Sequence, residues 1–336
     1  MDIKNKLYEE LLYLEGCKNT AIMISVTAKD DVRFKILPRR GVLNITISCF
    51  MINDKSLLKE TLSFFDGKVD YVYIDIEQKQ EVNLFEVARE VISESKLVTV
   101  KPNDSTFEAC DLLLRRQFND DLTNKKIIVI GTGNLASKIA TRLSERQADV
   151  YILGRSIEKE KRSVEALNLF LPKNTSSIQT FNNFPLDVKA DVVVSFLSGV
   201  FSNEDSLYPV IDNCTFIVDG GINNFSSEFI NKALASDIKI TRLDTRIALP
   251  YQMLSQFKYV HNFFDDVFGK AIIENIPIVS GGFIGAEGTI IVDNINQPKQ
   301  VLGIADGAGG VKKNEHLIEK DKNNIQRIQE FISANH

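Results

Sequence analysis

A glycine-rich stretch that can bind phosphate lies near the middle of the chain, where residues 127–136 read IIVIGTGNLA. The pattern G-x-G-x-x-A follows an apolar run and precedes a segment of helical period. In this context it is typical of a turn that binds the pyrophosphate of a dinucleotide at a helix N-terminus. Gly131 permits the tight turn, Gly133 lets the backbone approach the phosphates, and Ala136 lets the helix pack on the strand. The predicted contacts of this turn are Gly131, Thr132, Gly133, Asn134, Leu135 and Ala136.

The end of the next strand indicates which dinucleotide binds. Residues 149–156 read DVYILGRS, and the strand end carries no Asp or Glu. NAD-binding chains usually place there an acid that accepts hydrogen bonds from the ribose hydroxyls. Arg155 can instead pair with a 2′-phosphate, and Ser156 can add a hydrogen bond. The sequence thus predicts NADP in preference to NAD; the alternative leaves Arg155 in solvent and NAD bound through backbone groups.

A lysine and an aspartate precede this region in KPNDSTFEACDLLLRR, residues 101–116, which opens a predicted helix. Asp104 or Ser105 fits the N-cap of that helix, and this role is purely structural. A pair formed by Lys101 and Asp104 between two domains can also hold a substrate hydroxyl and move its proton while hydride leaves the same carbon. Both roles of Asp104 stay open on the residues alone.

Three further stretches carry polar candidates. In RIALPYQMLSQFKYVHNFF, residues 246–264, Gln252 stands at the entry of a predicted helix, as a substrate ligand or a backbone cap. The basic cluster RFKILPRRG, residues 33–41, is interpreted as a solvated loop in preference to an anion site. Asp75 and Glu77 end a predicted strand, where sites of α/β proteins gather. We interpret both as outward-facing strand residues in preference to substrate ligands.

Composition excludes several classes of function. The chain has 336 residues, of which 44% are hydrophobic and 25% charged, and its net charge of −5 gives no reason to expect nucleic acid. The apolar runs have the length of strands, so we expect no membrane partner. Three histidines and four scattered cysteines argue against a metal site or a histidine-based triad and favour a cytoplasmic setting. We expect a small-molecule substrate and, as the default for a closed symmetric assembly, a homodimer.

Strand-like and helix-like segments alternate through most of the chain, which predicts an α/β fold with largely parallel sheets. Early strands are expected at 21–27, 42–48, 69–76 and 97–100, with helices near 55–65, 83–95 and 105–117. The polar, turn-rich stretch 118–126 predicts a domain boundary. After it, strands at 125–131, 149–153, 177–181, 191–197, 215–219 and 238–243 alternate with helices at 134–147, 157–169 and 226–236.

These elements predict three parts. Residues 1–118 form an N-terminal α/β substrate domain, with 246–270 packing back onto it, and 119–245 form a doubly wound Rossmann domain. Residues 271–336 form an extension of open role, with two strands around a turn in 288–307 and a charged helix at about 313–334.

Three stretches resemble the shikimate dehydrogenase family, which belongs to a wider group that includes methylenetetrahydrofolate dehydrogenase. PNDSTFEACDLLL resembles the family's N-T-D-x-x-G-F segment, and IIVIGTGNLASKIATRL with YILGRS resembles its NADP-binding turn and strand end. Residues 222–257 resemble its last αβ unit with the L-Y-Q segment. VDGGIN, residues 218–223, also resembles V-I-D-V-G-I-N of the folate enzymes. The likeness covers roughly residues 100–262.

The resemblance implies roles for individual residues. Asp104 matches the catalytic aspartate and Gln252 the substrate-binding glutamine, with Asn103 and Tyr251 beside them as substrate contacts. Further cofactor contacts are implied at Ser198 and Gly220, which follow two predicted strands.

The family's lysine motif, N-V-T-x-P-x-K, is not matched. LNITISCFMINDK, residues 43–55, offers only Asn44, Thr46 and a distant Lys55. The catalytic lysine is therefore open between Lys101 and Lys55, with Lys101 favoured. The S-L-S pattern that binds the shikimate carboxylate is also absent from the N-terminus, which argues against shikimate itself.

The first hypothesis is thus an NADP-dependent oxidoreductase that moves hydride between the cofactor and a hydroxyl or carbonyl carbon of a small, polar, anionic metabolite. VDGGIN and the missing shikimate motifs leave open a C–N oxidoreductase that acts on an imine or a folate-like substrate. The unmatched lysine leaves open a non-catalytic dinucleotide-binding or scaffold protein.

Overall fold

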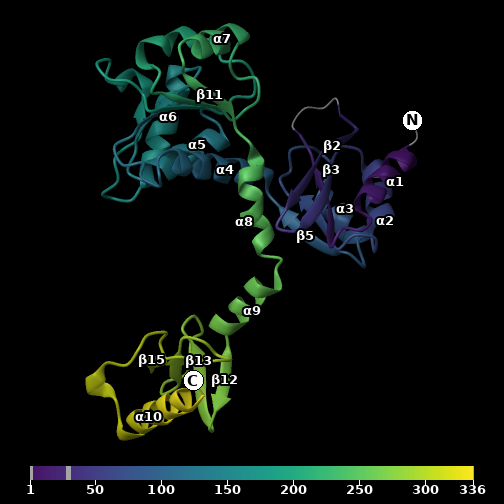
Figure 1. Cartoon of the computed structure of the whole chain (residues 1–336). Coiled ribbons are helices and arrows are strands. Elements are labelled where there is room, and N and C mark those ends of the chain that lie inside the picture. The colour runs from purple at the N-terminus through teal and green to yellow at the C-terminus, as the bar shows by residue number, and fades with distance from the viewer. Residues whose placement is uncertain (1–2, 28–31, 336) are drawn as a thin grey trace. The chain divides into compact units, whose positions relative to one another are not determined.

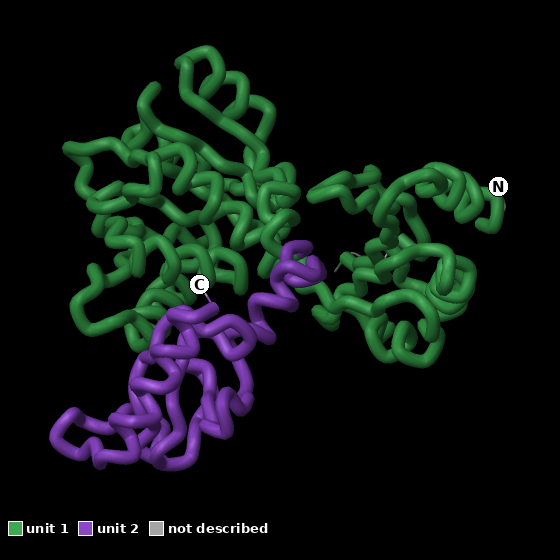
Figure 2. Tube along the Cα trace, turned by 60° about the horizontal axis from the view of Figure 1, so that its bottom comes forward, with its two compact units in different colours: residues 1–252 green, residues 253–336 purple. Residues whose placement is uncertain are grey.

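The computed structural model describes residues 3–27 and 32–335 (Figure 1). The chain divides by its internal contacts into residues 1–252 and 253–336 (Figure 2). Within the described residues, every helix is too short or too polar to span a bilayer.

The N-terminal part of the first unit is a sheet of order β2-β3-β1-β4-β5 with three helices. Its elements are α1 Ile3–Leu14, β1 Asn19–Ser25, β2 Phe34–Val42, β3 Ile45–Ile52, α2 Lys55–Phe65, β4 Tyr71–Asp75, α3 Leu84–Val91 and β5 Lys96–Val100. The strands pair in parallel, except that β2 is antiparallel to β3. Alternate strand residues such as Ile22, Phe50 and Val72 share one buried cluster with all three helices, so the helices pack on one face.

The basic cluster at residues 33–41 differs from its prediction, because most of it forms strand β2 and not a loop. β2 lies at the edge of the sheet, where Pro38 can be accommodated and where the register shifts between Leu37 and Arg40. Leu43 and Asn44 form a two-residue turn to β3 with φ of 49° and 64°, as hairpin turns of this length require. This turn also divides the single strand predicted at 42–48.

The basic side chains of this strand region serve the fold. Arg39 pairs with Glu10 of α1 at 3.0 Å and stacks on Tyr13 at 3.9 Å, and Arg33 pairs with Asp54. Glu10 is buried and also accepts a hydrogen bond from Ser48 at 2.7 Å.

The second part of the first unit follows, with a parallel sheet of order β11-β10-β9-β6-β7-β8. Its elements are α4 Pro102–Gln117, β6 Lys126–Ile130, α5 Asn134–Glu145, β7 Asp149–Leu153, α6 Ile157–Asn168, β8 Gln179–Thr180, β9 Val192–Ser195, β10 Phe216–Asp219, α7 Ser227–Ala235 and β11 Lys239–Arg242. Counted along the chain from β6, this is the doubly wound order 6-5-4-1-2-3 of a Rossmann fold, which confirms the predicted fold class. The strand order reverses between β6 and β9, where such sheets bind their ligands.

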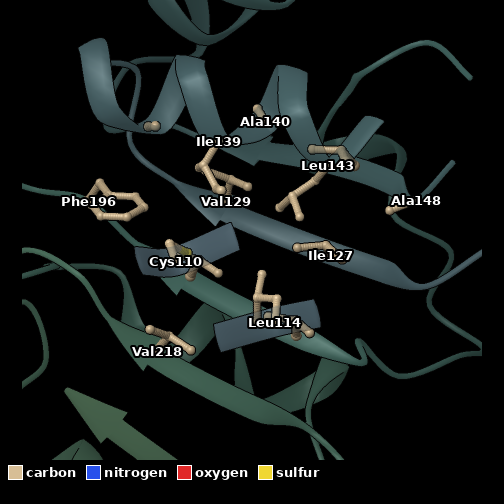
Figure 3. Close-up of a cluster of buried hydrophobic side chains, with 14 of the residues drawn as sticks. Cys110, Leu114, Ile127, Val129, Ile139, Ala140, Leu143, Ala148, Phe196 and Val218 are labelled. Atoms are coloured by element: carbon tan, nitrogen blue, oxygen red, sulfur yellow. The ribbon is translucent and has the colours of Figure 1, made fainter. Parts of the chain in front are cut away.

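Helix α4 packs with this second sheet, although the predicted boundary at 118 assigned it to the N-terminal domain. Ala109, Cys110 and Leu114 are fully buried in one cluster with Ile127 and Val129 of β6 (Figure 3). The polar stretch after α4 reverses the chain, with Asn119 and Asp120 at positive φ, before β6 begins. Its turn-rich composition therefore reflects a chain reversal within one packed layer.

A buried carboxylate ties α4 to α5. The side chain of Asp111 is 0% exposed and accepts hydrogen bonds from Arg146 at 2.5 and 2.7 Å and from Arg142 at 3.3 Å. Both arginines lie on the last turns of α5 or directly after it. Because a helix rises about 1.5 Å per residue, this tie holds α4 about 10 Å from Asp104 and fixes where its first turn lies.

The second unit has a sheet of order β12-β13-β14-β15 and a helix that packs on it. The last elements of the chain are η4 Thr245–Ala248, α8 Leu249–Leu254, α9 Lys258–Val267, β12 Lys270–Ile273, β13 Ile276–Ser280, β14 Ile290–Val292, β15 Val301–Ile304 and α10 Glu319–Ala334. β14 and β15 pair antiparallel, as the sequence predicted for 288–307, and α10 is the predicted charged helix. Ile328 and Ile332 of α10 share the core with Ile278 and Ile290.

The tie at Asp111 gives a test of stability. Replacing Asp111 by Asn removes the charge that two arginines share, and we expect the free energy of unfolding to fall by about 3 kcal/mol. Asp120→Asn is the matched control, because its pair with Arg115 is exposed at the surface and should change stability by no more than about 0.5 kcal/mol. Urea unfolding followed by circular dichroism measures both; equal stability of the two variants would contradict the role of the tie.

Candidate functional site

The glycine-rich turn has the geometry that its sequence predicts. Gly131 has a φ of 129°, and a Cβ there would lie 2.7 Å from the carbonyl oxygen of Phe196 and 3.2 Å from the Cβ of Ala136. Only glycine fits that position. A Cβ on Gly133 would instead meet nothing within 4 Å. The backbone of Gly133 therefore faces open space, from which a phosphate can approach.

Helix α5 begins at this turn without a side chain that caps it. Gly133 is the N-cap, and no side-chain hydrogen bond satisfies the first backbone N–H groups. By contrast, Ser156 caps α6 and Ser226 caps α7. Free N–H groups and the helix dipole favour an anion at the start of α5.

The predicted phosphate ligands after β7 lie on the surface. Arg155 is exposed, and it forms no ion pair within the part of the chain that the structure describes. Ser156 has a structural role that the sequence did not predict, because its hydroxyl oxygen accepts the N–H of Lys159 at 3.4 Å as the N-cap of α6. Its hydroxyl proton can still be donated. The neighbouring Arg162 pairs with Glu158.

An acid lies at the end of β7 after all, although it comes from the following helix. Glu160, in the first turn of α6, is 3% exposed, and its carboxylate accepts the N–H of Gly154 at 2.8 Å. The sequence of the strand end does not reveal this contact. Glu160 lies six residues after Gly154, inside α6, and only the fold of the helix brings its carboxylate back to the strand end.

Asp104 lies between two lysines. Lys101 Nζ is 2.5 Å from Oδ2 of Asp104, and Lys138 of α5 contacts Oδ1. The predicted N-cap role of Asp104 and Ser105 is wrong: Lys101 is the N-cap residue and Pro102 opens the helix. Proline is favoured at this first position because its fixed φ suits the helix and its missing N–H is not needed there. Lys138 was not predicted, since only the packing of α4 on α5 brings it to Asp104.

The two lysines decide which group carries the proton. Burial raises the pKa of Asp104, but hydrogen bonds from Lys101 and Lys138 outweigh it, so that this pKa lies below its usual range. The hydrogen bond to Asp104 raises the pKa of Lys101. At neutral pH Asp104 is therefore a carboxylate and Lys101 an ammonium, and Lys101 is the group that can donate a proton.

The first turn of α4 is also held by the N-terminal sheet. Glu77 accepts the N–H of Asn103 at 3.0 Å and pairs with Lys79 at 2.7 Å. Lys79 pairs in turn with Asp75 at 3.3 Å. The interpretation of Asp75 and Glu77 as outward-facing residues is wrong, because the Asp75 side chain is 0% exposed and accepts the N–H of Glu77 at 2.8 Å. Burial raises the pKa of Asp75.

Lys55, the alternative catalytic lysine, lies elsewhere. It opens α2, and its positive charge acts on Glu90 beyond the middle of α3. Of the two candidate lysines, Lys101 thus contacts Asp104, whereas Lys55 lies on α2 and acts on Glu90 of α3.

A groove of about 670 Å³ runs along α4 and α5 and includes Asp104 and Lys138. Tyr251 and Gln252 of α8 also line it, and the Gln252 amide donates a hydrogen bond to the hydroxyl of Ser105. The remaining lining residues are Phe107, Glu108, Ser137, Thr141, Arg142, Glu145, Leu167 and Ala248. The structure therefore brings Asp104, Tyr251 and Gln252 together in the lining of one groove.

Ser198 and Gly220 belong to loops that a buried asparagine joins. Asn224 accepts hydrogen bonds from Leu197 N–H and the Ser195 hydroxyl, both at 2.9 Å, and donates to the carbonyls of Leu197 and Gly199. Gly220 packs on the ring of Phe196, and Ser198 is exposed. Asn224 was not predicted, although it directly follows the VDGGIN motif.

Part of the chain is similar to a known family of dehydrogenases. The family model for shikimate / quinate 5-dehydrogenase matches residues 113–199. A search of the curated proteins finds no match. Among solved structures, a shikimate dehydrogenase in complex with NADP+ is similar at 13% identity over 70% of this chain and 87% of its own, with a TM-score of 0.39. A shikimate dehydrogenase from Aquifex aeolicus is similar at 18% identity over 73% and 93%, with a TM-score of 0.41.

A glutamate dehydrogenase variant is also similar, at 11% identity with a TM-score of 0.37. The match spans 64% of this chain and 60% of the length of that relative. The matched family segment runs from the second half of α4, through the glycine-rich turn and β7, to the loop after β9. The resemblance predicted from the sequence is thereby confirmed for residues 113–199, the segment that is similar to the shikimate dehydrogenase family.

Proposed function

We propose that the chain is an NADP-dependent oxidoreductase, which transfers hydride between NADP(H) and the hydroxyl or carbonyl carbon of a small polar metabolite. The observation that carries this proposal is the placement of Asp104. It lies in a groove, against Lys101 and against a lysine of the helix that starts at the glycine-rich turn. The matched family model supports the oxidoreductase part, while NADP and the class of substrate are proposals.

The residues around the turn fit a dinucleotide. Gly131, Gly133 and the uncapped start of α5 would hold the pyrophosphate, and Arg155 would pair with the 2′-phosphate. Bound NADPH would supply a hydride to the substrate carbon.

The chain's own residues handle the proton. In the direction of reduction, the Lys101 ammonium gives a proton to the carbonyl oxygen as that oxygen gains negative charge. Asp104 keeps Lys101 protonated and oriented through their ion pair. Glu77, in turn, holds the first turn of α4 that carries both groups. The Gln252 amide, which donates a hydrogen bond to Ser105, would orient a polar group of the substrate.

A second candidate, the C–N oxidoreductase, is favoured by the charge of the groove. Lys138 is paired with Asp104, and Arg142 with Glu108 at 3.7 Å and Asp111 at 3.3 Å. Because both cations of the lining already have carboxylate partners, the groove offers less attraction to an anionic substrate than the sequence predicts. The paired cations do not weaken the attraction of the groove for a substrate that carries an amine.

Arg155 tests the cofactor. We expect Arg155→Ala to weaken NADPH binding by one to two powers of ten, about 1.4 kcal/mol for each, because a 2′-phosphate loses its partner. NADH affinity should stay the same. Titration followed by nicotinamide fluorescence measures both, with Arg162→Ala as the control because Arg162 is paired with Glu158. An equal loss for both nucleotides would contradict the assignment of Arg155 to the phosphate.

Asp104 and the two candidate lysines test the chemistry. Asp104→Asn and Lys101→Met should each lower turnover by about 10²–10⁴-fold and leave NADPH affinity nearly intact. Because Asp104 raises the pKa of Lys101, any residual activity of Asp104→Asn should lose its alkaline limb at a lower pH than the wild type. Lys55→Met, the matched control, should retain activity.

These variants are assayed as NADPH oxidation against a panel of small carbonyl compounds and imines. Full turnover in Asp104→Asn would reduce Asp104 to a structural partner of the two lysines. Loss of turnover in Lys55→Met alone would move the catalytic lysine to α2.

A further inference from the structure

The acid at the end of β7 sits where it can act on the adenosine end of a dinucleotide. A Cβ on Gly154 would be 2.9 Å from the Thr132 methyl and 3.3 Å from the Glu160 Cβ. Gly154 thus lies between Thr132 of the glycine-rich turn and Glu160, at a position where a side chain would contact both. The Glu160 carboxylate accepts the Gly154 N–H, next to the backbone of Arg155.

Glu160 has no cationic partner among the described residues, and at 3% exposure it is hardly accessible to water. The Gly154 N–H and the N-terminal end of the α6 dipole compensate its charge locally. Glu158, two residues earlier, differs in both respects, because its side chain is 74% exposed and paired with Arg162. The two acids therefore form a matched pair, one buried and one solvated, on the same helical turn.

The 2′-phosphate predicted at Arg155 would feel both an attraction and a repulsion. Arg155 is exposed, so water and salt screen its attraction for the phosphate. The Glu160 charge is buried, so its repulsion of the same phosphate is screened less. A buried charge can thus offset much of what a solvated charge contributes.

We propose that Glu160 is a specificity-determining residue that opposes the 2′-phosphate and thereby lowers the preference of the site for NADPH over NADH. Arg155 favours the phosphate and Glu160 disfavours it, and the wild type binds the two nucleotides with affinities that differ by about tenfold or less. This inference rests on the proposed dinucleotide site and adds to it how strongly that site discriminates.

Glu160→Gln separates charge from hydrogen bonding, because the glutamine amide oxygen can still accept the Gly154 N–H. The four proteins to compare are the wild type, Glu160→Gln, Arg155→Ala and the double variant, each titrated with NADPH and NADH by nicotinamide fluorescence. Glu158→Gln is the control for a general change of charge on α6. Thermal melting of each protein verifies that it is folded.

We expect Glu160→Gln to bind NADPH about tenfold more tightly than the wild type and NADH within about twofold. The gain should shrink as salt is raised, and the double variant should return NADPH affinity towards the wild-type value. Glu158→Gln should bind both nucleotides like the wild type.

Three results would overturn the inference while the dinucleotide site stands. They are an unchanged NADPH affinity in Glu160→Gln, a loss of NADH affinity in that variant, which would make Glu160 a ribose ligand, and a wild-type preference for NADPH of more than about a hundredfold. The wild-type preference is measured without a variant, so a preference above about a hundredfold overturns the inference even if the Glu160→Gln protein does not fold. A wild type that binds neither nucleotide would instead remove the proposed function together with this inference.

Discussion

The site depends on one interaction, the ion pair of the buried Asp111 carboxylate with Arg146 and Arg142. A carboxylate without exposed surface is costly unless charged donors satisfy it, so α4 has one favourable register along α5. The first turn of α4 then lies against the first turns of α5. Asp104 meets Lys138 for this reason, and the candidate proton-handling groups come to lie beside α5, the helix that begins at the glycine-rich turn. Glu77 secures the other side of that turn of α4 through the Asn103 N–H.

Charges in this region are arranged in alternating order. The order from the N-terminal sheet to α5 is Asp75, Lys79, Glu77, Lys101, Asp104 and Lys138. Consecutive members form ion pairs, except that Glu77 acts on Lys101 through its charge alone. Such an arrangement keeps Asp104 ionised and Lys101 protonated over a wide range of pH. The proposed roles, with Lys101 as proton donor and Asp104 as its positioning partner, depend on this arrangement. The proposed cofactor site has a similar opposition of charges, between the exposed Arg155 and the buried Glu160.

Local features of the fold and site were predictable from the sequence. The glycine-rich turn, the alternation of strands and helices and the C-terminal strand pair follow from the types of adjacent residues and from the spacing of apolar residues. The structure confirms all three. Residues that act through tertiary packing were not predictable. Lys138 and Glu160 sit on helical faces whose partners only the packing reveals, and Asp75 resembles an ordinary strand-end acid until the neighbouring strands bury it. β2 has the composition of a loop, because it contains Pro38 and several arginines. It is nevertheless an edge strand, and its region's charges are either paired or exposed at the surface.

The central claim is that this chain transfers hydride, and deuterium transfer tests it even while the substrate is unidentified. The wild-type protein would be incubated with NADPH deuterated at the reactive C4 position and with a protein-free extract of small metabolites, and the products analysed by mass spectrometry. If the chain transfers hydride, deuterium appears on carbon in at least one reduced metabolite, and the Asp104→Asn protein forms far less of it. Tight NADPH binding without deuterium in any metabolite would contradict hydride transfer and favour a dinucleotide-binding protein that is not an enzyme.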